Sequence, residues 1–194
     1  HAWCCDAKGS VSKLKSIYPE LLSIKIGGSQ GGSEREVYIA KPVLDNVELF
    51  VGTPVEDYII KRGFTREDAF LWGILAKQKT IVVVPLYNDK GEYIFWVEKD
   101  TITGKYNNPQ GVSRSSLIWV RYCSLSKDII LVEGVFDAMR VLSAGFNVMI
   151  LLGTILFEAE VDYIEKHSLN PILFLDSDVK YPIYKKIQKK LDRF

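Results

Sequence analysis

The chain has 194 residues, of which 47% are hydrophobic, and its formal net charge at pH 7 is +1. This length is sufficient for one or two modest hydrophobic cores, and the near-neutral charge excludes a strongly basic nucleic-acid coat protein. No apolar run approaches the roughly 20 residues of a membrane-spanning helix, and the N-terminus lacks a signal-peptide pattern. The three cysteines are too few for a disulfide framework. We therefore expect a cytoplasmic protein without a membrane partner.

The first half of the chain predicts short helices and loops. Apolar residues recur at helical spacing within residues 11–22, and residues 27–33 have the Gly and Ser content of a connecting loop. Two further short helices are expected at residues 55–61 and 65–75. Arg62-Gly63 separates them, because a glycine commonly ends a helix.

A β-hairpin is expected after these helices. Residues 80–87 and 92–97 are rich in β-branched and aromatic side chains, and Asn88-Asp89-Lys90-Gly91 lies between them. Such a turn sequence between two β-rich runs is typical of a hairpin.

The last third of the chain predicts a parallel sheet. Continuous apolar runs at residues 129–132, 148–152 and 172–175 alternate with segments of helical pattern, which is a β-α-β-α-β unit. Continuous hydrophobicity indicates strands that helices cover on both faces. We place a domain boundary near Lys127.

Acidic residues follow the first and third of these runs. Glu133 ends the first, Asp176 and Asp178 end the third, and Asp137 comes one helical turn after Glu133. Ligands of parallel α/β sheets gather at the carboxyl ends of the strands. If the two strands are neighbours, the carboxylates share one crevice, where a hard divalent cation would relieve their repulsion. The sequence thus predicts a Mg²⁺ or Mn²⁺ site.

The segment after the second run is a possible phosphate contact. Gly153-Thr154 ends that strand at the same edge of the sheet, where a helix N-terminus can bind phosphate oxygens. A purely structural interpretation is also open. Glu133 and Asp137 could be acidic residues in the first turn of a helix, and Asp176 and Asp178 could form a turn.

Three motifs of the last third together resemble the Toprim domain: Val132-Glu133-Gly134-Val135-Phe136-Asp137, Leu152-Gly153-Thr154 and Leu175-Asp176-Ser177-Asp178. The Toprim domain occurs in DnaG-type primases, topoisomerases and some nucleases. The resemblance implies that Glu133, Asp176 and Asp178 hold divalent metal ions during phosphoryl transfer. It also implies catalytic roles for Glu133 and Asp137.

The preceding segment resembles the DnaG-type primases in particular. The motifs that carry the resemblance are Lys61-Arg62-Gly63-Phe64, the run from Val84-Pro85 to Gly91, and Lys105-Tyr106-Asn107-Asn108-Pro109, and Lys99 falls where the family has an arginine. The resemblance implies nucleotide- or DNA-binding roles for Lys99, Lys105, Tyr106 and Asn108. Independently of the resemblance, Lys99, Lys105 and Arg114 could supply positive charge to a template or a nucleoside triphosphate, and Tyr106 and Trp119 could offer stacking faces for bases.

Tyr106 and Trp119 could instead be core aromatics of a solvated hairpin. The basic stretch at residues 180–193 could contact DNA, or it could be the exposed face of a terminal helix. Both alternatives stay open at this point.

The N-terminal residues resemble the end of a primase zinc ribbon, in which Cys5 matches the final ligand. The first half of the ribbon is absent, so Zn²⁺ is expected only if that half is present, because a structural zinc site needs about four ligands. At the other end, Val179-Lys180-Tyr181-Pro182 replaces the family's usual continuation. The family's further strand and later acidic motif do not appear before Phe194, so we expect an incomplete Toprim domain.

The expected fold is α/β: an α+β N-terminal subdomain at residues 19–127, followed by a Toprim β-α-β-α-β unit at 128–194. Residues 1–18 are expected to be a remnant of the zinc ribbon with a linker helix. We expect a primase that synthesises short RNA primers on a single-stranded DNA template from nucleoside triphosphates. A replicative helicase is the expected protein partner, and the bacterial cytoplasm is the expected location, with a phage gene as a possible source. The alternatives are a non-catalytic Toprim DNA-binding module and a topoisomerase- or nuclease-like enzyme.

Overall fold

The structure is a computed structural model, and it describes residues 46–88, 93–109 and 114–194. The chain divides into two compact units, residues 1–38 and 39–194, and all the described residues belong to the second. The expectations for Cys5, for a helix within residues 11–22 and for a loop at 27–33 therefore lie outside the described residues.

An antiparallel sheet, which we call sheet A, occupies the first part of the described chain. Its five strands stand in the order β1-β2-β3-β4-β5. They are β1 (Val47–Leu49), β2 (Leu75–Lys77), β3 (Ile81–Tyr87), β4 (Tyr93–Asp100) and β5 (Tyr106–Asn107). The pairing of β3 with β4 confirms the predicted hairpin. The short strands β1, β2 and β5 were not predicted.

Two short helices, α2 (Pro54–Lys61) and α3 (Arg66–Leu71), connect β1 to β2. The Thr53 side chain caps α2 and a Thr65–Asp68 capping box begins α3, which satisfies backbone N–H groups that a helix start leaves unpaired. Gly63 has a φ of +86°, a conformation that favours glycine and ends α2 as predicted. The second helix was predicted too long. It ends before Gly73, whose φ is +64°, and Leu75 already belongs to β2.

The second sheet, sheet B, is the predicted parallel unit with one addition. Its order is β6-β8-β7-β9, with β6 (Val120–Arg121), β7 (Asp128–Val132), β8 (Asn147–Ile150) and β9 (Asn170–Leu173). The strand β7 pairs in parallel with both β8 and β9. The strands that carry the acidic residues are thus neighbours, as the metal-site prediction requires. The short antiparallel strand β6 was not predicted.

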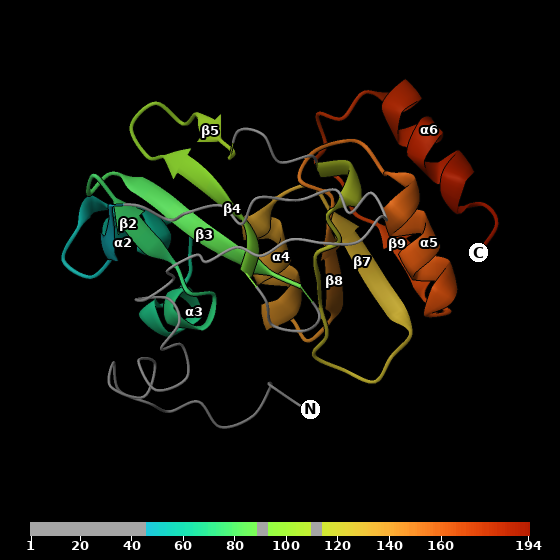
Figure 1. Ribbon diagram of the computed structural model, residues 1–194, viewed down its shortest axis with the longest axis horizontal. Coiled ribbons are helices and arrows are strands. Elements are labelled where there is room, and N and C mark those ends of the chain that lie inside the picture. The colour runs from blue at the N-terminus through green and yellow to red at the C-terminus, as the bar shows by residue number, and fades with distance from the viewer. Residues whose placement is uncertain (1–45, 89–92, 110–113) are drawn as a thin grey trace, which may run out of the picture. The chain divides into compact units, whose positions relative to one another are not determined.

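Three helices cover the two faces of sheet B (Figure 1). They are α4 (Val135–Ser143), α5 (Glu158–Lys166) and α6 (Tyr181–Leu191). One face packs on α4, and the other packs on α5 and α6. Coverage of both faces is confirmed for β7 and β8. The prediction is wrong for β9, because it is an edge strand whose Ile172 is 49% exposed.

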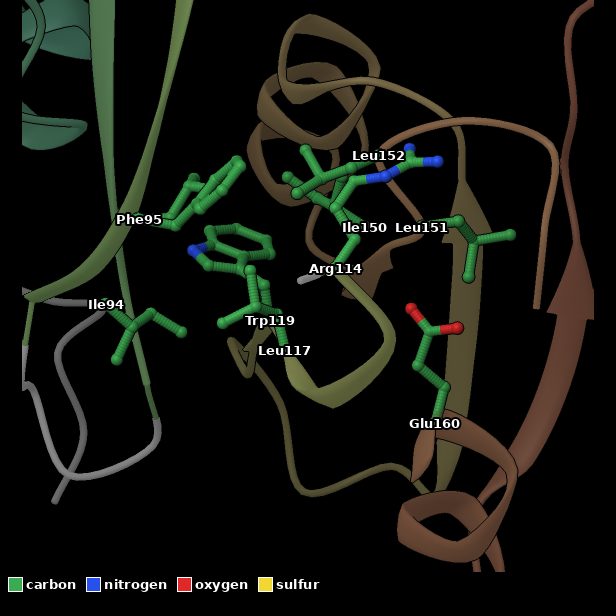
Figure 2. A pocket seen from close by; sticks show the side chains of 10 residues that line it. Ile94, Phe95, Arg114, Leu117, Trp119, Ile150, Leu151, Leu152 and Glu160 are labelled. Carbon is green, nitrogen blue, oxygen red and sulfur yellow. The ribbon is translucent and has the colours of Figure 1, made fainter. Parts of the chain in front are cut away.

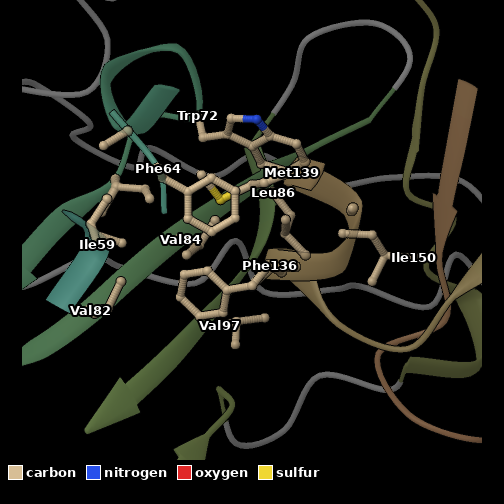
Figure 3. Close-up of a cluster of buried hydrophobic side chains, with 14 of the residues drawn as sticks. Ile59, Phe64, Trp72, Val82, Val84, Leu86, Val97, Phe136, Met139 and Ile150 are labelled. Atoms are coloured by element: carbon tan, nitrogen blue, oxygen red, sulfur yellow. The ribbon is translucent and has the colours of Figure 1, made fainter. Parts of the chain in front are cut away.

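The side chains of α4 also pack against sheet A. Phe136 and Met139 belong to the same buried cluster as Val84 and Val97 (Figure 3). One continuous core therefore joins the two sheets. None of the described helices is long and apolar enough to cross a membrane.

Candidate functional site

The carboxyl ends of β7 and β9 meet at one edge of sheet B. The backbone N–H of Asp176 donates a hydrogen bond of 3.0 Å to Oε1 of Glu133, which joins the loops after the two strands. Asp178 lies two residues further and is exposed, and Asp137 lies in the first turn of α4. The structure thus brings together the acidic residues that the sequence singled out.

Burial and the acidic surroundings raise the pKa values of Glu133 and Asp137. Burial is the largest cause that raises the pKa of Glu133, and the charges of Asp176, Asp178 and Asp137 raise it further. The hydrogen bond from Asp176 opposes this shift. Burial also raises the pKa of Asp137, and the charge of Asp176 adds to it, while Arg140 and Arg62 lower it. Negative charge is therefore concentrated at this edge, which is what a cation would relieve.

Among the described residues, no three His, Cys, Asp or Glu side chains are arranged so that they could hold a metal ion together. The chemistry of the donors nevertheless fits a hard divalent cation. Mg²⁺ keeps several water ligands and binds through one or two carboxylates together with substrate phosphates. Glu133 and one of Asp176 and Asp178 could supply those carboxylates.

Lys99 and Tyr106 form a cross-strand pair between β4 and β5. The Lys99 ammonium lies 3.8 Å from the centroid of the Tyr106 ring, and 52% of the Tyr106 surface is exposed. Burial of its hydroxyl is the main reason that the pKa of Tyr106 is raised, and the charges of Asp137 and Asp176 contribute to the shift. Sheet A thus presents an aromatic ring and a cation within electrostatic reach of the acidic edge.

Two arginines near Asp137 were missed as site residues. The Arg62 guanidinium lies 4.4 Å from the centroid of the Phe136 ring and donates a hydrogen bond to the Tyr58 hydroxyl. Arg140 forms an ion pair of 3.7 Å with Asp137 and donates to the carbonyl oxygen of Arg62. The Arg62-Gly63 pair was visible in the sequence as a helix end and as a family motif. Its proximity to α4 depends on tertiary packing and has no local signal.

Lys105 and Asn108, two other predicted binding residues, are exposed. Lys105 follows the turn that begins at Asp100, and its charge acts on the carboxylate of Asp100, whose pKa is lowered mainly by backbone hydrogen bonds from that turn. A contact of Lys105 and Asn108 with nucleic acid stays a prediction.

Arg114 lies in the short 3₁₀ helix η2 (Arg114–Ser116), and its guanidinium packs on Gly153. The N–H of Gly153 donates a hydrogen bond of 3.1 Å to the carbonyl oxygen of Glu133. Arg114 is thus placed beside the loop that follows β8, at the carboxyl edge of sheet B. Trp119, in contrast, is 2% exposed and stacks on Trp72 at 5.2 Å, so it is a core aromatic.

Two basic residues at the end of the chain have structural partners. Lys190 on α6 donates to the carbonyl oxygen of Leu156 and pairs with Glu158 at 2.5 Å, and Arg193 pairs with Glu165 at 3.7 Å.

Comparisons with known proteins agree with this architecture. A family model described as Toprim-like matches residues 130–181. No curated protein sequence matches the chain significantly.

Several solved structures are similar to the chain. A DnaG primase catalytic domain bound to single-stranded DNA has a TM-score of 0.54 at 14% identity, over 70% of this chain and 57% of that chain. The RNA polymerase domain of Mycobacterium tuberculosis primase DnaG has a TM-score of 0.54 at 15% identity, over 87% of this chain and 68% of that chain. The primase fragment of the bacteriophage T7 primase-helicase protein has a TM-score of 0.50 at 16% identity, over 69% of this chain and 58% of that chain.

The chain spans less than two thirds of the length of the first and third of these structures. At such low identities the likeness concerns the fold. It agrees with the expected α/β architecture. Glu133 and Asp176 lie within the residues that the Toprim-like family model matches. Residues 130–181 match a Toprim-like family model, within a chain whose fold is similar to that of the DnaG-type primase catalytic core.

Proposed function

We propose that this chain is the catalytic core of a primase, a DNA-dependent RNA polymerase that makes short RNA primers on single-stranded DNA. The observation that carries the proposal is the hydrogen bond between Asp176 and Glu133. It joins two acidic strand ends within electrostatic reach of Tyr106, and Lys99 lies over the Tyr106 ring. Clustered carboxylates beside a cation and an exposed aromatic ring suit a reaction that joins nucleotides.

In the proposed reaction, Glu133, Asp176 and Asp178 would hold one or two Mg²⁺ or Mn²⁺ ions. These ions would stabilise the developing charge on the phosphoryl oxygens. Asp137, or Glu133 in place of its role as a metal ligand, is the candidate to accept the proton of the attacking 3′-hydroxyl, because burial raises the pKa of each carboxyl above its ordinary value.

The cationic side chains act on the nucleic acid and the nucleotide. Arg62 and Lys99 would neutralise phosphates near the acidic edge, and the exposed ring of Tyr106 would stack on a base. Lys105 and Asn108 extend this surface along β5. Arg114 would meet phosphate oxygens at the end of β8.

The proposed substrates are a single-stranded DNA template and nucleoside triphosphates, and the proposed location is the bacterial cytoplasm, with a bacterial or a phage gene as the source. A replicative helicase is the proposed partner, and the likeness to a primase-helicase fragment supports it. Cys5 would bind Zn²⁺ only together with ligands that complete a zinc ribbon.

A second candidate is a non-catalytic Toprim module that binds DNA. The observation that favours it is that no three acidic side chains among the described residues are arranged to hold a metal ion together. Such a module would bind single-stranded DNA without joining nucleotides. A topoisomerase- or nuclease-like enzyme would instead cleave DNA.

The test is primer synthesis on single-stranded DNA with four ribonucleotides and Mg²⁺ or Mn²⁺. We expect short RNA products, which Asp176→Asn reduces at least about a hundredfold while DNA affinity stays within about twofold. The matched control is Asp162→Asn on the exposed side of α5, which should retain synthesis. DNA binding without products would support the non-catalytic module, and cleavage of the template would support the nuclease-like alternative.

A further inference from the structure

The Arg114 guanidinium has donors that no described residue uses. Its side chain is half-buried, and the structure contains no hydrogen bond or ion pair from its guanidinium to another described residue. Figure 2 shows the guanidinium beside Leu152, on the side away from Trp119. A guanidinium presents five N–H donors in a planar fork that matches phosphate oxygens. The hydrogen-bonding capacity of the group is therefore available to a ligand.

Gly153 makes the space in which this guanidinium lies. A Cβ atom on Gly153 would stand 2.8 Å from Nη1 of Arg114, a distance that real Cβ atoms essentially never show. Gly153 also has a φ of +137°, and the preceding Leu152 has a φ of +52°. Any other residue at 153 would thus be strained in its backbone and would displace the guanidinium.

The same glycine connects Arg114 to the acidic edge. Its N–H donates to the carbonyl oxygen of Glu133 at 3.1 Å, and the N–H of Leu151 donates to Val132 at 2.8 Å. These bonds fix the loop after β8 against the loop that carries the Glu133 carboxylate. The cation and the carboxylates therefore belong to one edge of the sheet.

A structural role for Arg114, as counter-ion of the buried Glu160, is the alternative. Both residues line a cavity of about 10 Å³, roughly the space of one water. Glu160 already accepts a hydrogen bond of 2.8 Å from the N–H of Phe157. Burial raises the pKa of Glu160 to about 8, and the charge of Arg114 opposes this rise. No hydrogen bond or ion pair joins the two side chains in the described part of the chain, so the N–H donors of Arg114 are not used from that side.

We infer that Gly153 is a positioning residue, which aims the Arg114 guanidinium at a phosphate of a nucleoside triphosphate bound beside Glu133. This inference rests on the proposed function for the identity of the ligand. The role of Gly153 is to leave room, and Arg114 makes the contact.

The test is a double-mutant cycle on the binding of ATP, measured calorimetrically at pH 7 in EDTA, so that no metal-dependent step is involved. We expect Arg114→Ala to weaken binding roughly tenfold to a hundredfold, as for the loss of charge-assisted hydrogen bonds. Gly153→Ala should weaken it about tenfold in the wild-type background and not at all in the Arg114→Ala background. The control is Gly145→Ala, because Gly145 also has a positive φ but faces open space. It should leave ATP binding unchanged.

Additive effects of Gly153→Ala and Arg114→Ala would overturn the inference, as would a wild-type chain that does not bind ATP. If the Gly153→Ala variant does not fold, the thermal melting of the Gly153→Ala/Arg114→Ala double variant is measured instead. A double variant that folds supports the inference, because removal of the guanidinium has relieved the clash. A double variant that stays unfolded overturns it, because the backbone conformation alone then requires glycine. Coupled ATP binding without primer synthesis would leave the inference standing and refute the proposed function. Primer synthesis without the coupling would do the reverse.

Discussion

The backbone N–H of Asp176 donates to Oε1 of Glu133 over 3.0 Å. One carboxylate oxygen of Glu133 is therefore used to join the loops after β7 and β9. Glu133 contributes both to the architecture of the acidic edge and to its charge, and a substitution can separate the two contributions.

Glu133→Gln should retain the bond to Asp176 and remove the charge. The pKa of Glu133 is raised above its ordinary 4.5, first by burial and then by its acidic neighbours. The folded state therefore holds the proton more tightly than the unfolded state, and wild-type stability falls as the pH rises above about 4.5. In EDTA at pH 7.5 we expect the variant to be as stable as the wild type or up to roughly 1 kcal/mol more stable. Urea unfolding measures this.

The control for this prediction is Glu133→Ala, which loses the hydrogen bond and should be less stable than Glu133→Gln by about 1 kcal/mol. Primer synthesis should fall at least about a hundredfold in both variants. A Glu133→Gln chain that melts well below the wild type in EDTA would show that the carboxylate is stabilising rather than repelled.

Arg62→Ala should weaken binding to single-stranded DNA. Its guanidinium lies over the Phe136 ring of α4, and its charge opposes the rise in the pKa of Asp137, so Arg62 at the end of α2 is a cation beside the acidic edge. We expect the affinity for single-stranded DNA to fall about three- to tenfold. The slope of log affinity against log salt concentration should become shallower by the amount that corresponds to about one phosphate contact. Lys166→Ala at the exposed end of α5 is the control. Equal losses in the two variants would indicate a general charge effect.

Glu160→Gln should alter the pH dependence of stability. Burial raises the pKa of Glu160 to about 8, from 4.5 in the unfolded chain. The wild type should thus lose stability as the pH rises from about 4.5 to 8, on the order of a few kcal/mol, because the unfolded state releases the proton first. The amide keeps an acceptor for the N–H of Phe157 and does not titrate. Urea unfolding at several pH values measures the free energy of unfolding of both proteins. The difference between Glu160→Gln and the wild type should change as the pH rises from about 4.5 to 8, in favour of the variant. A difference that is the same at every pH would contradict the raised pKa of Glu160.

Asn147→Leu should be strongly destabilising. The Asn147 side chain is 1% exposed, accepts hydrogen bonds from the N–H groups of Cys123 and Ser124, and donates to the carbonyl oxygens of Ser126 and Asp128. Leucine would leave these groups unpaired, at a cost of roughly 2–4 kcal/mol. Asn170→Ala, at an exposed asparagine, should cost less than about 1 kcal/mol. Urea unfolding of both variants makes the comparison.

The sequence was informative where local pattern and tertiary position coincide. The apolar runs of β7 and β8 are buried on both faces, so their continuous hydrophobicity identifies them as strands of a parallel sheet. The β3–β4 pair was predictable because its turn residues separate two long β-rich runs. The acidic edge followed from these strands, because Glu133 comes directly after β7.

The sequence did not predict the short strands, or the contacts between segments that are distant along the chain. The strands β5 and β6 have two residues each, and pairing with a neighbour defines them rather than any pattern of their own. β9 reads as a buried strand, yet no described strand covers its outer edge. The position of Arg62 beside Asp137 depends on how α2 packs on α4, which no periodicity encodes.

The core that sheet A and sheet B share limits how the proposed site can move. Phe136 and Met139 of α4 lie among Val84 and Val97 of sheet A, so a hinge between the sheets would expose these side chains to water. Opening and closing around a substrate must then come from side chains and surface segments such as β5, and not from a rigid-body swing of one sheet against the other. The distance between sheet A and sheet B at the proposed site would therefore be the same before and after a substrate binds.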